Sequence, residues 1–376
     1  MEFLFSSTLV HRVMVSPYRT IDPISRGHDE GAGPLTRHEL DAVLATLRRS
    51  KEPSIQWKVR VHVLGEDRTS RGILDLEEEI RRSPRVRALL SRRTQLGRPG
   101  TARGVYYKWQ GIHWVLASLA DIGYPAGDAG LLPLRDRILE LWLRPSYYQE
   151  YVARSKAETH RVGVPRIRGR YRRCASQQGN ALYFLTRLGI ADQRADALVE
   201  RLLHWQWPDG GWNCDRRPEA DTSSFMETTL PMLGLAAYGQ QRKSPLAAEA
   251  AERAAEVLLR RRLFKRARDG RIIHPDFVRL HYPLYYFYDF LGGLKAMARL
   301  GKIRDRRCTD ALDLLERKRL PGGGWPAEGR YYKSQARMLR SNADFVDWGG
   351  ASSKRWNEWV TTDALAVLVA AGRVLV

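Results

Sequence analysis

Two kinds of helix alternate along this sequence, and the alternation constrains the fold more than any other feature. One kind is amphipathic, with charged residues on one face, and is predicted at 36–49, 75–92, 131–143, 195–205, 245–262 and 306–318. The other kind is apolar or aromatic over most of its surface and is predicted at 106–123, 174–190, 222–238, 281–299 and 358–373. A helix with one polar stripe lies against solvent, whereas a helix that is apolar on most sides is buried or lines a cavity. The chain therefore predicts an all-α fold of outer and inner helices.

The outer and inner helices follow one another in pairs, so we expect a series of αα-hairpins. A sixth hairpin requires residues 53–64 as the inner partner of 36–49. That stretch has the two-residue period of a strand, so helix and strand both remain open there, on Ile55, Trp57, Val59, Val61 and Val63. The outer helices end at irregular intervals of about 55 residues, and a unit that cannot bury its inner face alone must stack on its neighbours. We predict that six hairpins close into an (α/α)6 toroid.

The domain organisation follows from the same pattern. Residues 1–35 are rich in Pro, Gly and Ser with little periodicity, and we predict a flexible or peripherally packed leader, followed by one toroid domain over 36–376. The opening residues have neither a basic segment nor a small-residue cleavage site, so a signal peptide is not expected. No stretch approaches the ~18 apolar residues of a membrane span.

Three cysteines and a strong positive charge bear on the location and the partners. Cys174, Cys214 and Cys308 cannot all pair and lack CxxC spacing, which predicts reduced thiols in a cytoplasmic protein, with peripheral membrane attachment as an alternative. The net charge of +21 is spread over the whole chain, and no RNP-like, C₂H₂ or homeodomain pattern accompanies it. We interpret it as a solvated basic surface. An anionic membrane surface or an acidic substrate stays open, and nucleic acid is not the expected partner.

Two glycine-rich turns follow amphipathic helices, at 202–215 (LLHWQWPDGGWNCD) and 314–325 (LLERKRLPGGGW). The first resembles the QW motif of squalene and oxidosqualene cyclases, through Gln206, Asp209, Gly210, Gly211 and Trp212. The second turn keeps Gly324 and Trp325 but has no Gln. Over about residues 75–374 the chain resembles the terpenoid cyclase and protein prenyltransferase superfamily. The resemblance implies an α/α toroid in which these turns brace neighbouring hairpins.

The motifs that carry chemistry in this superfamily are absent. Class II cyclases protonate their substrate with an Asp of a DxDD motif, and the nearest segment here, Asp344-Phe345-Val346-Asp347, has different spacing. The DDxxD motif of class I cyclases, which binds magnesium and diphosphate, does not occur either. The sequence gives little direct support to proton-initiated cyclisation.

Protein prenyltransferases offer a closer comparison at their zinc site. Asp221 matches the spacing of their zinc-binding Asp after the Gly-Gly-aromatic turn, but Ser223 stands where they have Cys, and a hydroxyl is a poor zinc ligand. Tyr286 falls at the position of their His, and His281 lies more than one helical turn away. We therefore expect no cofactor, with zinc as an open alternative.

Polar and aromatic residues gather where the inner helices are predicted to begin, which is what a ligand pocket requires. The candidate catalytic residues are Asp221, Glu227, His281 and Asp289. The candidate substrate-binding residues are Tyr107, Trp109, His113, Ser223, Tyr282, Tyr285, Tyr286, Trp356, Trp359 and Asp363. Each Asp or Ser at a helix start is also a natural N-cap, and a His between aromatic residues is also a normal core residue.

The resemblance implies a terpenoid cyclase-like or prenyltransferase-like protein that binds or transforms a polyprenyl substrate in a central aromatic cavity. The expected partner is a hydrophobic or amphiphilic small molecule. Two alternatives remain. One is a non-catalytic binding or scaffold toroid. The other is an (α/α)6 polysaccharide lyase or glycosidase, in which His281, Tyr282 and Asp276 act on an acidic glycan.

Overall fold

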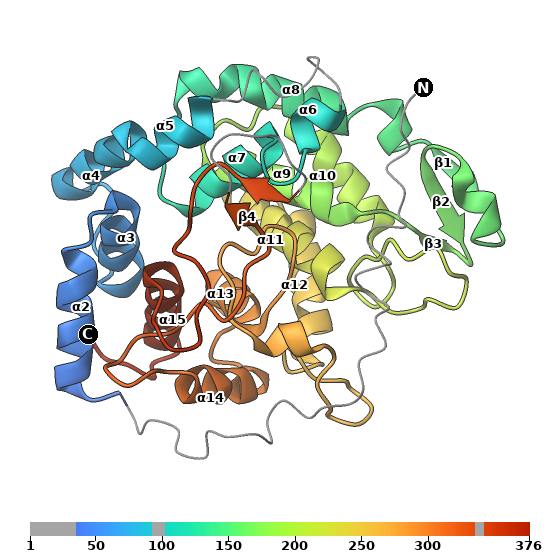
Figure 1. Ribbon diagram of the computed structural model, residues 1–376. Coiled ribbons are helices and arrows are strands. Elements are labelled where there is room, and N and C mark those ends of the chain that lie inside the picture. The colour runs from blue at the N-terminus through green and yellow to red at the C-terminus, as the bar shows by residue number, and fades with distance from the viewer. Residues whose placement is uncertain (1–34, 92–101, 335–341) are drawn as a thin grey trace. The chain divides into compact units, whose positions relative to one another are not determined.

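The computed structural model describes residues 35–91, 102–334 and 342–376, and this part of the chain is mostly helical, as the all-α prediction requires (Figure 1). The leader predicted for 1–35 lies outside the described residues except for Leu35. Among the helices described, none combines the length and the apolar character needed to cross a bilayer.

The predicted outer helices form with small differences in their bounds. They are α2 (Arg37–Arg48), α4 (Arg71–Arg82), α5 (Pro84–Ser91), α8 (Leu132–Trp142), α10 (Arg194–Trp205), α12 (Pro245–Leu259) and α14 (Thr309–Arg317). Each buries one face. In α10, for example, Leu198, Leu202 and Trp205 point inward at the three- and four-residue spacing of a helix face. The single helix predicted at 75–92 is instead two, because Ser83 has an extended backbone before Pro84, which has no N–H to donate.

The predicted inner helices also form. They are α3 (Pro53–Lys58), continued by a π-helical turn η1 (Val59–Val63), then α7 (Ile112–Asp121), α9 (Ala175–Arg187), α11 (Phe225–Arg242), α13 (Phe290–Arg299) and α15 (Glu358–Ala370). The strand alternative for 53–64 is wrong. Ile55, Trp57 and Val59 are fully buried in a helix that packs on α4 and α15, and these tertiary contacts outweigh the strand preference of β-branched residues.

Two inner helices begin later than the sequence predicts. The helix predicted from 106 starts at Ile112, and the helix predicted from 281 starts at Phe290, where the Asp289 side chain accepts the Gly292 N–H at 2.8 Å as an N-cap. Pro283 lies within the second segment and cannot supply a helical N–H. The aromatic residues expected on the first turns of these helices therefore lie in irregular segments that precede them.

The remaining elements are short. They are α6 (Ala102–Tyr106), η2 (Ala129–Leu131), η3 (Pro145–Tyr147), η4 (Ala157–His160), η5 (Pro275–Val278) and η6 (Arg306–Cys308). Strands β1 (Glu150–Val152), β2 (Val164–Ile167) and β3 (Arg170–Tyr171) form one sheet in that order, with β1 parallel and β3 antiparallel to β2. Strands β4 (Lys333–Ser334) and β5 (Ala343–Asp344) pair in parallel.

Contacts between helices join segments that are far apart in the chain. Among the inner helices, α9 packs against both α7 and α11, α13 packs against α15, and α15 packs against α3 and η1 (Figure 1). The first outer helix also contacts the end of the chain. Arg319 Nη1 lies 3.0 Å from Glu39 Oε1, and Ser50 Oγ donates to Glu358 Oε2 at 2.9 Å. Helices from the first and the last hairpins are therefore neighbours.

The two glycine-rich turns have the same hydrogen bonds. The Trp212 indole N–H donates to the Leu202 carbonyl at 3.0 Å, and the Trp325 indole N–H donates to the Leu315 carbonyl at 2.7 Å. The backbone N–H of each Trp donates to a threonine hydroxyl of the next inner helix. Trp212 donates to Thr228 at 3.2 Å, and Trp325 donates to Thr361 at 2.9 Å. The two turns therefore share one local hydrogen-bond arrangement.

Gln206 joins the first of these turns to the neighbouring hairpin. Its amide nitrogen donates to the Gly210 carbonyl at 2.7 Å and to the Ala250 carbonyl of α12 at 2.8 Å, and its oxygen accepts from Arg253 of the same helix. At Gly211 an added Cβ would lie 2.4 Å from the Thr228 hydroxyl, so only glycine fits this close approach of turn and helix.

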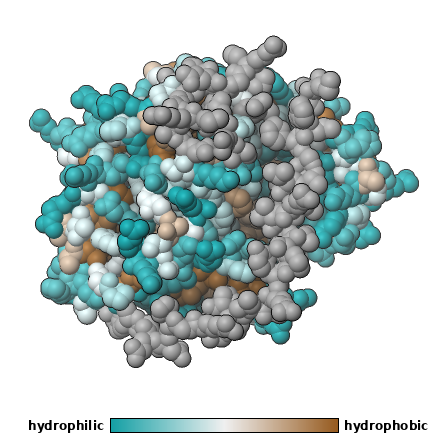
Figure 2. Space-filling view, viewed as in Figure 1, coloured by the Kyte–Doolittle hydropathy of each residue, from teal (hydrophilic) through white to brown (hydrophobic). Residues whose placement is uncertain are grey.

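The surface is mostly polar on the face shown in Figure 2, with apolar residues scattered between charged ones. The large apolar side chains that are exposed in the described part of the chain are scattered along the sequence, apart from the adjacent last two: Leu74, Val152, Val162, Leu246, Trp356, Leu375 and Val376. Such scattered exposure is normal for a folded chain.

Candidate functional site

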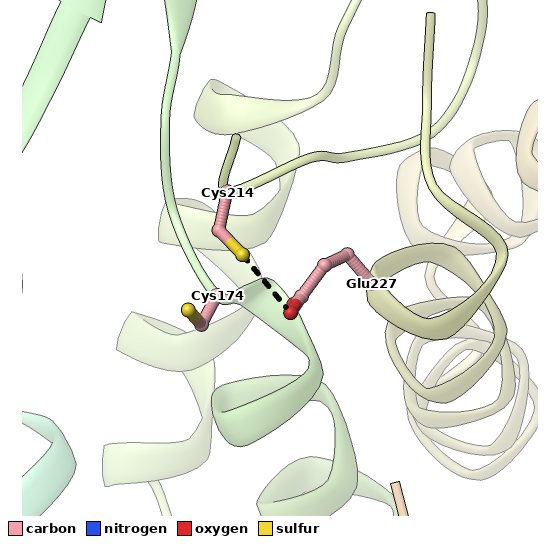
Figure 3. A group of neighbouring side chains, drawn as sticks. All are labelled: Cys174, Cys214 and Glu227. Atoms are coloured by element: carbon pink, nitrogen blue, oxygen red, sulfur yellow. Dashed lines mark hydrogen bonds between the residues drawn. The ribbon is translucent and has the colours of Figure 1, made fainter. Parts of the chain in front are cut away.

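Two thiols and a carboxylate meet at the amino-terminal ends of α9 and α11 (Figure 3). One ligand atom each from Cys174, Cys214 and Glu227 lie within 4.8 Å of one another, and the Cys214 Sγ is 3.4 Å from Glu227 Oε1. Cys174 is the residue before α9, Cys214 lies two residues after the turn tryptophan Trp212, and Glu227 is in the first turn of α11. We call these three residues the thiol cluster.

Close packing of α9 against α11 brings the thiol cluster together. A Cβ added to Gly179 would lie 2.4 Å from the Pro231 backbone, and one added to Gly234 would lie 2.4 Å from the Gly179 carbonyl. The two helices approach this closely because glycine has no side chain at either position. Their first turns are consequently within reach of each other.

Burial governs the electrostatics of the thiol cluster. The Glu227 side chain is 8% exposed, its Oε2 accepts the Ser176 backbone N–H at 2.9 Å, and burial raises its pKa. The neighbouring Cys174 thiol and burial together raise the pKa of Cys214 well above its usual range. Negative charge on Glu227 or Cys214 is therefore disfavoured unless a cation accompanies it.

Two half-buried cations lie near the thiol cluster. Lys108 Nζ lies 2.9 Å from the Tyr286 hydroxyl and 4.5 Å from the centre of that ring, and burial lowers the pKa of Lys108. Arg173 bonds to the neutral amides of Gln177 and Gln178 at 2.9 and 3.3 Å, and burial lowers its pKa as well. Within the described ranges, neither cation has a carboxylate at ion-pair distance, so both have capacity for an anion.

Aromatic rings from three chain segments stack beside Lys108. Trp109 stacks on Tyr285 with centroids 4.2 Å apart, Tyr286 on Phe287 at 4.4 Å, and Phe287 on Tyr331 at 4.0 Å. We call these five residues the aromatic layer. Burial, and then the charges of Glu227, Cys174 and Cys214, raise the pKa of Tyr286, which shows that the layer borders the thiol cluster.

His281 and Asp289 form a buried pair at the edge of the aromatic layer. The His281 ring stacks on Tyr331 at 4.3 Å, and its Nδ1 is 3.4 Å from Asp289 Oδ2. The same oxygen accepts the His281 backbone N–H at 2.9 Å, while the other caps α13. Both carboxylate oxygens of Asp289 therefore accept backbone N–H groups, and these hydrogen bonds allow the side chain to be completely buried.

His113 is enclosed between two inner helices and α8. Its Nδ1 is 3.3 Å from the Trp142 indole nitrogen, and its Nε2 is 3.1 Å from the Asn180 amide. An indole N–H only donates, so Nδ1 accepts and the neutral ring carries its proton on Nε2, an assignment that requires the Asn180 amide to present its oxygen to this nitrogen. Burial lowers the pKa of His113 to about 3.

This environment predicts acid sensitivity. In the unfolded chain His113 binds a proton below about pH 6.5, whereas in the folded chain it stays neutral down to about pH 3. The unfolded state thus binds more protons between these values, and the free energy of unfolding should fall by about 2 kcal/mol between pH 7.5 and pH 5 from this group alone. Urea unfolding at the two pH values measures the loss. In His113→Gln the fall in the free energy of unfolding between the two pH values should be smaller by about 2 kcal/mol. An equal fall in the wild type and the variant would contradict the assignment of this pH dependence to His113.

Three further predicted site residues differ in their exposure and hydrogen bonds. Asp221 is exposed, and Ser223 is buried with its N–H and hydroxyl bonded to Asp209 at 2.8 and 2.6 Å. The Tyr107 carbonyl accepts the Gln110 and Gly111 N–H groups in a turn.

Tyr282, Trp359 and Asp363 belong to a second cluster at α3, α7, α13 and α15. Lys58 Nζ lies 3.0 Å from Asp121 Oδ2 and 2.9 Å from Asp363 Oδ1, and the Tyr282 hydroxyl donates to Asp121 at 2.9 Å while its ring stacks on Trp359. Lys295 contacts both carboxylates and Arg299 contacts Asp121. We call Lys58, Asp121, Lys295 and Asp363 the buried charge network.

In the buried charge network, ion pairing outweighs the effect of burial on the pKa values. Burial alone would raise the pKa of Asp121, but Lys295 and Lys58 hold it well below its usual range. Burial would likewise lower the pKa of Lys58, and Asp121 and Asp363 raise it instead. Both carboxylates and Lys58 are therefore charged in the folded protein, and Asp363 is engaged with lysines of two helices.

Sequence reasoning missed the residues that complete the candidate site. Cys174 and Cys214 were expected only to be reduced thiols, and Lys108 and Arg173 stood among many basic residues. The available signals were the position of Cys174 directly before an inner helix and of Cys214 directly after the DGGW turn. Comparison with protein-family models, with curated proteins and with solved structures found no match to this chain.

Proposed function

We propose that the chain is a six-hairpin α/α toroid of the terpenoid cyclase and protein prenyltransferase type. The pairing of outer and inner helices supports this, as do the contacts of α15 with α3 and of Arg319 with Glu39, which bring the first and last hairpins together. The matching hydrogen bonds of Trp212 and Trp325 support it further, because they indicate internal repetition of one hairpin unit.

We further propose that the protein binds an isoprenoid diphosphate at the amino-terminal ends of its inner helices. The observation that carries this proposal is the aromatic layer bordered by Lys108, with Arg173 beside the neighbouring thiol cluster. Aromatic faces accept a polyprenyl chain and stabilise allylic cations through their quadrupole. A diphosphate would give the two cations the anionic partner that they lack among the described residues.

Binding measurements test this function. Farnesyl diphosphate, farnesol, squalene and an acidic oligosaccharide are titrated separately, with calorimetry as the readout. We expect farnesyl diphosphate to bind best and Lys108→Met to weaken it by roughly ten- to a hundredfold, as loss of a charge-assisted bond would do, with little effect on farnesol. Lys302→Met, which removes a surface lysine paired with Glu252, is the matched control. Tighter binding of the oligosaccharide would favour the glycan alternative, and binding of none of the four would end the proposal.

One observation favours the scaffold alternative as the second candidate. The rings of the aromatic layer contact one another directly, with stacked centroids 4.0–4.4 Å apart, so a ligand must displace some of them. A scaffold would keep these rings packed. Tryptophan fluorescence on addition of farnesyl diphosphate discriminates the two, because displacement of Tyr285 from Trp109 changes the indole environment.

A further inference from the structure

We propose that Cys174, Cys214 and Glu227 form a binding site for a divalent metal ion of the zinc class. Two sulfurs and a carboxylate oxygen are a normal ligand set for zinc, whereas magnesium and calcium prefer oxygen alone. The inference does not rest on the isoprenoid proposal, and its residues differ from Asp221 and Ser223, the positions that the sequence resemblance compares with a zinc site.

The spacing of the ligand atoms fits such an ion. Tetrahedral zinc with ordinary bond lengths separates a sulfur from an oxygen ligand, or two sulfurs, by roughly 3.5–3.8 Å. The Cys214 Sγ is 3.4 Å from Glu227 Oε1, and the three ligand atoms lie within 4.8 Å of one another. Small rotations of the two cysteine side chains would therefore complete the three-ligand arrangement.

The three ligands are held in place by contacts outside the cluster. Glu227 Oε2 accepts the Ser176 N–H at 2.9 Å, which leaves Oε1 directed at the Cys214 thiol (Figure 3). The segment that carries Cys214 is fixed just before this residue by the buried Trp212 and by Asn213, whose amide donates to the Thr222 carbonyl at 2.8 Å. Such outer contacts orient the ligands of metal sites.

The surrounding charges suit a thiolate-ligated ion. Two thiolates and a carboxylate around a doubly charged ion leave one net negative charge in a partly buried place. Lys108 and Arg173 are the nearby cations that have no ion pair in the described part of the chain, and they compensate this charge. Three protein ligands also leave one coordination position for water or a substrate atom, as in catalytic zinc sites.

A disulfide between Cys174 and Cys214 is the competing explanation for two neighbouring thiols. It accounts for the sulfurs but not for the carboxylate, since Glu227 is buried, fixed by a backbone N–H and directed at Cys214. A metal ion explains all three groups together. The disulfide is accordingly an outcome that the experiment must separate from metal binding.

Metal analysis of the full-length protein tests the inference. The reduced protein is loaded with zinc, dialysed and measured by mass spectrometry of the metal, and Co²⁺ loading gives an independent readout through its thiolate charge-transfer absorption. We expect roughly one ion per chain in the wild type and in Cys308→Ser, which removes a buried thiol elsewhere. Cys214→Ser should lose the ion, and Glu227→Gln should bind it at least tenfold more weakly.

Three results would overturn the inference. They are a metal content that is the same in Cys214→Ser as in the wild type, no metal uptake by the reduced wild type, or a Cys174–Cys214 disulfide that forms in the zinc-loaded protein in place of metal binding. Because Cys214→Ser can perturb folding, a zinc-dependent rise in the melting temperature of the wild type is measured as well, and its absence counts against the site. None of these measurements uses an isoprenoid, so failure here is distinct from failure of the proposed function.

Discussion

Replacing Lys58 by methionine is expected to lower the free energy of unfolding by about 3–5 kcal/mol. The Lys58 side chain is 2% exposed and lies within 3.0 Å of both Asp121 and Asp363. Methionine fills the same space without a charge, so within the described part of the chain the two carboxylates keep Lys295 and Arg299 as ion-pair partners. Loss of one member of a buried network is costly because the remaining charges stay buried without full compensation.

Urea unfolding of Lys58→Met and of a matched surface variant measures the effect. Lys302→Met removes a lysine whose partner Glu252 is about half exposed, and such a pair contributes at most about 1 kcal/mol. Adding Asp363→Asn to Lys58→Met should cost less than the sum of the two single changes, since the residues interact directly. A loss of less than 1 kcal/mol for Lys58→Met would show that the network is not a stabilising feature.

The helices could be predicted from the sequence because their signals are local. Apolar residues at helix spacing, as in α10, set the outer elements to within a few residues. The starts of α7 and α13 could not be predicted in this way. The aromatic residues around Trp109 and Tyr285 have the pattern of an inner helix in the sequence, but in the structure they are ordered by stacking on each other. The strand period at 53–64 was overridden by packing against α4 and α15.

The candidate site depends on contacts between distant segments, which local patterns do not contain. Glu227 and Trp109 are predicted near the starts of inner helices and Tyr286 at the position of the prenyltransferase His, and the structure places all three around one region. Cys174 and Cys214 are forty residues apart in the sequence, 174 against 214, and meet only because Gly179 lets α9 and α11 approach. Cysteine spacing rules look for ligands close in sequence and therefore give no signal for such a pair.

Replacing either turn tryptophan by alanine is expected to cost about 3–5 kcal/mol of folding stability. Trp212 and Trp325 are both at most 1% exposed, and each ties the end of an outer helix, through Leu202 or Leu315, to the start of the following inner helix. Alanine removes both the buried ring and the indole N–H, so a large cavity and an unpaired carbonyl remain. If the two turns are repeats of one unit, the two losses should agree to within about 1 kcal/mol.

Denaturant unfolding of both alanine variants, with phenylalanine variants beside them, resolves the contributions. Trp212→Phe and Trp325→Phe keep most of the apolar volume but lose the bond to the helix carbonyl, so each should cost less than its alanine counterpart. Leu246→Ala, at a residue 65% exposed, is the control and should change stability by about 1 kcal/mol or less. A large loss at Trp212 with almost none at Trp325 would contradict the repeat. Since Gln206 braces only the first turn, equal losses would indicate that the tryptophan, rather than the Gln, is the element that the two hairpins share.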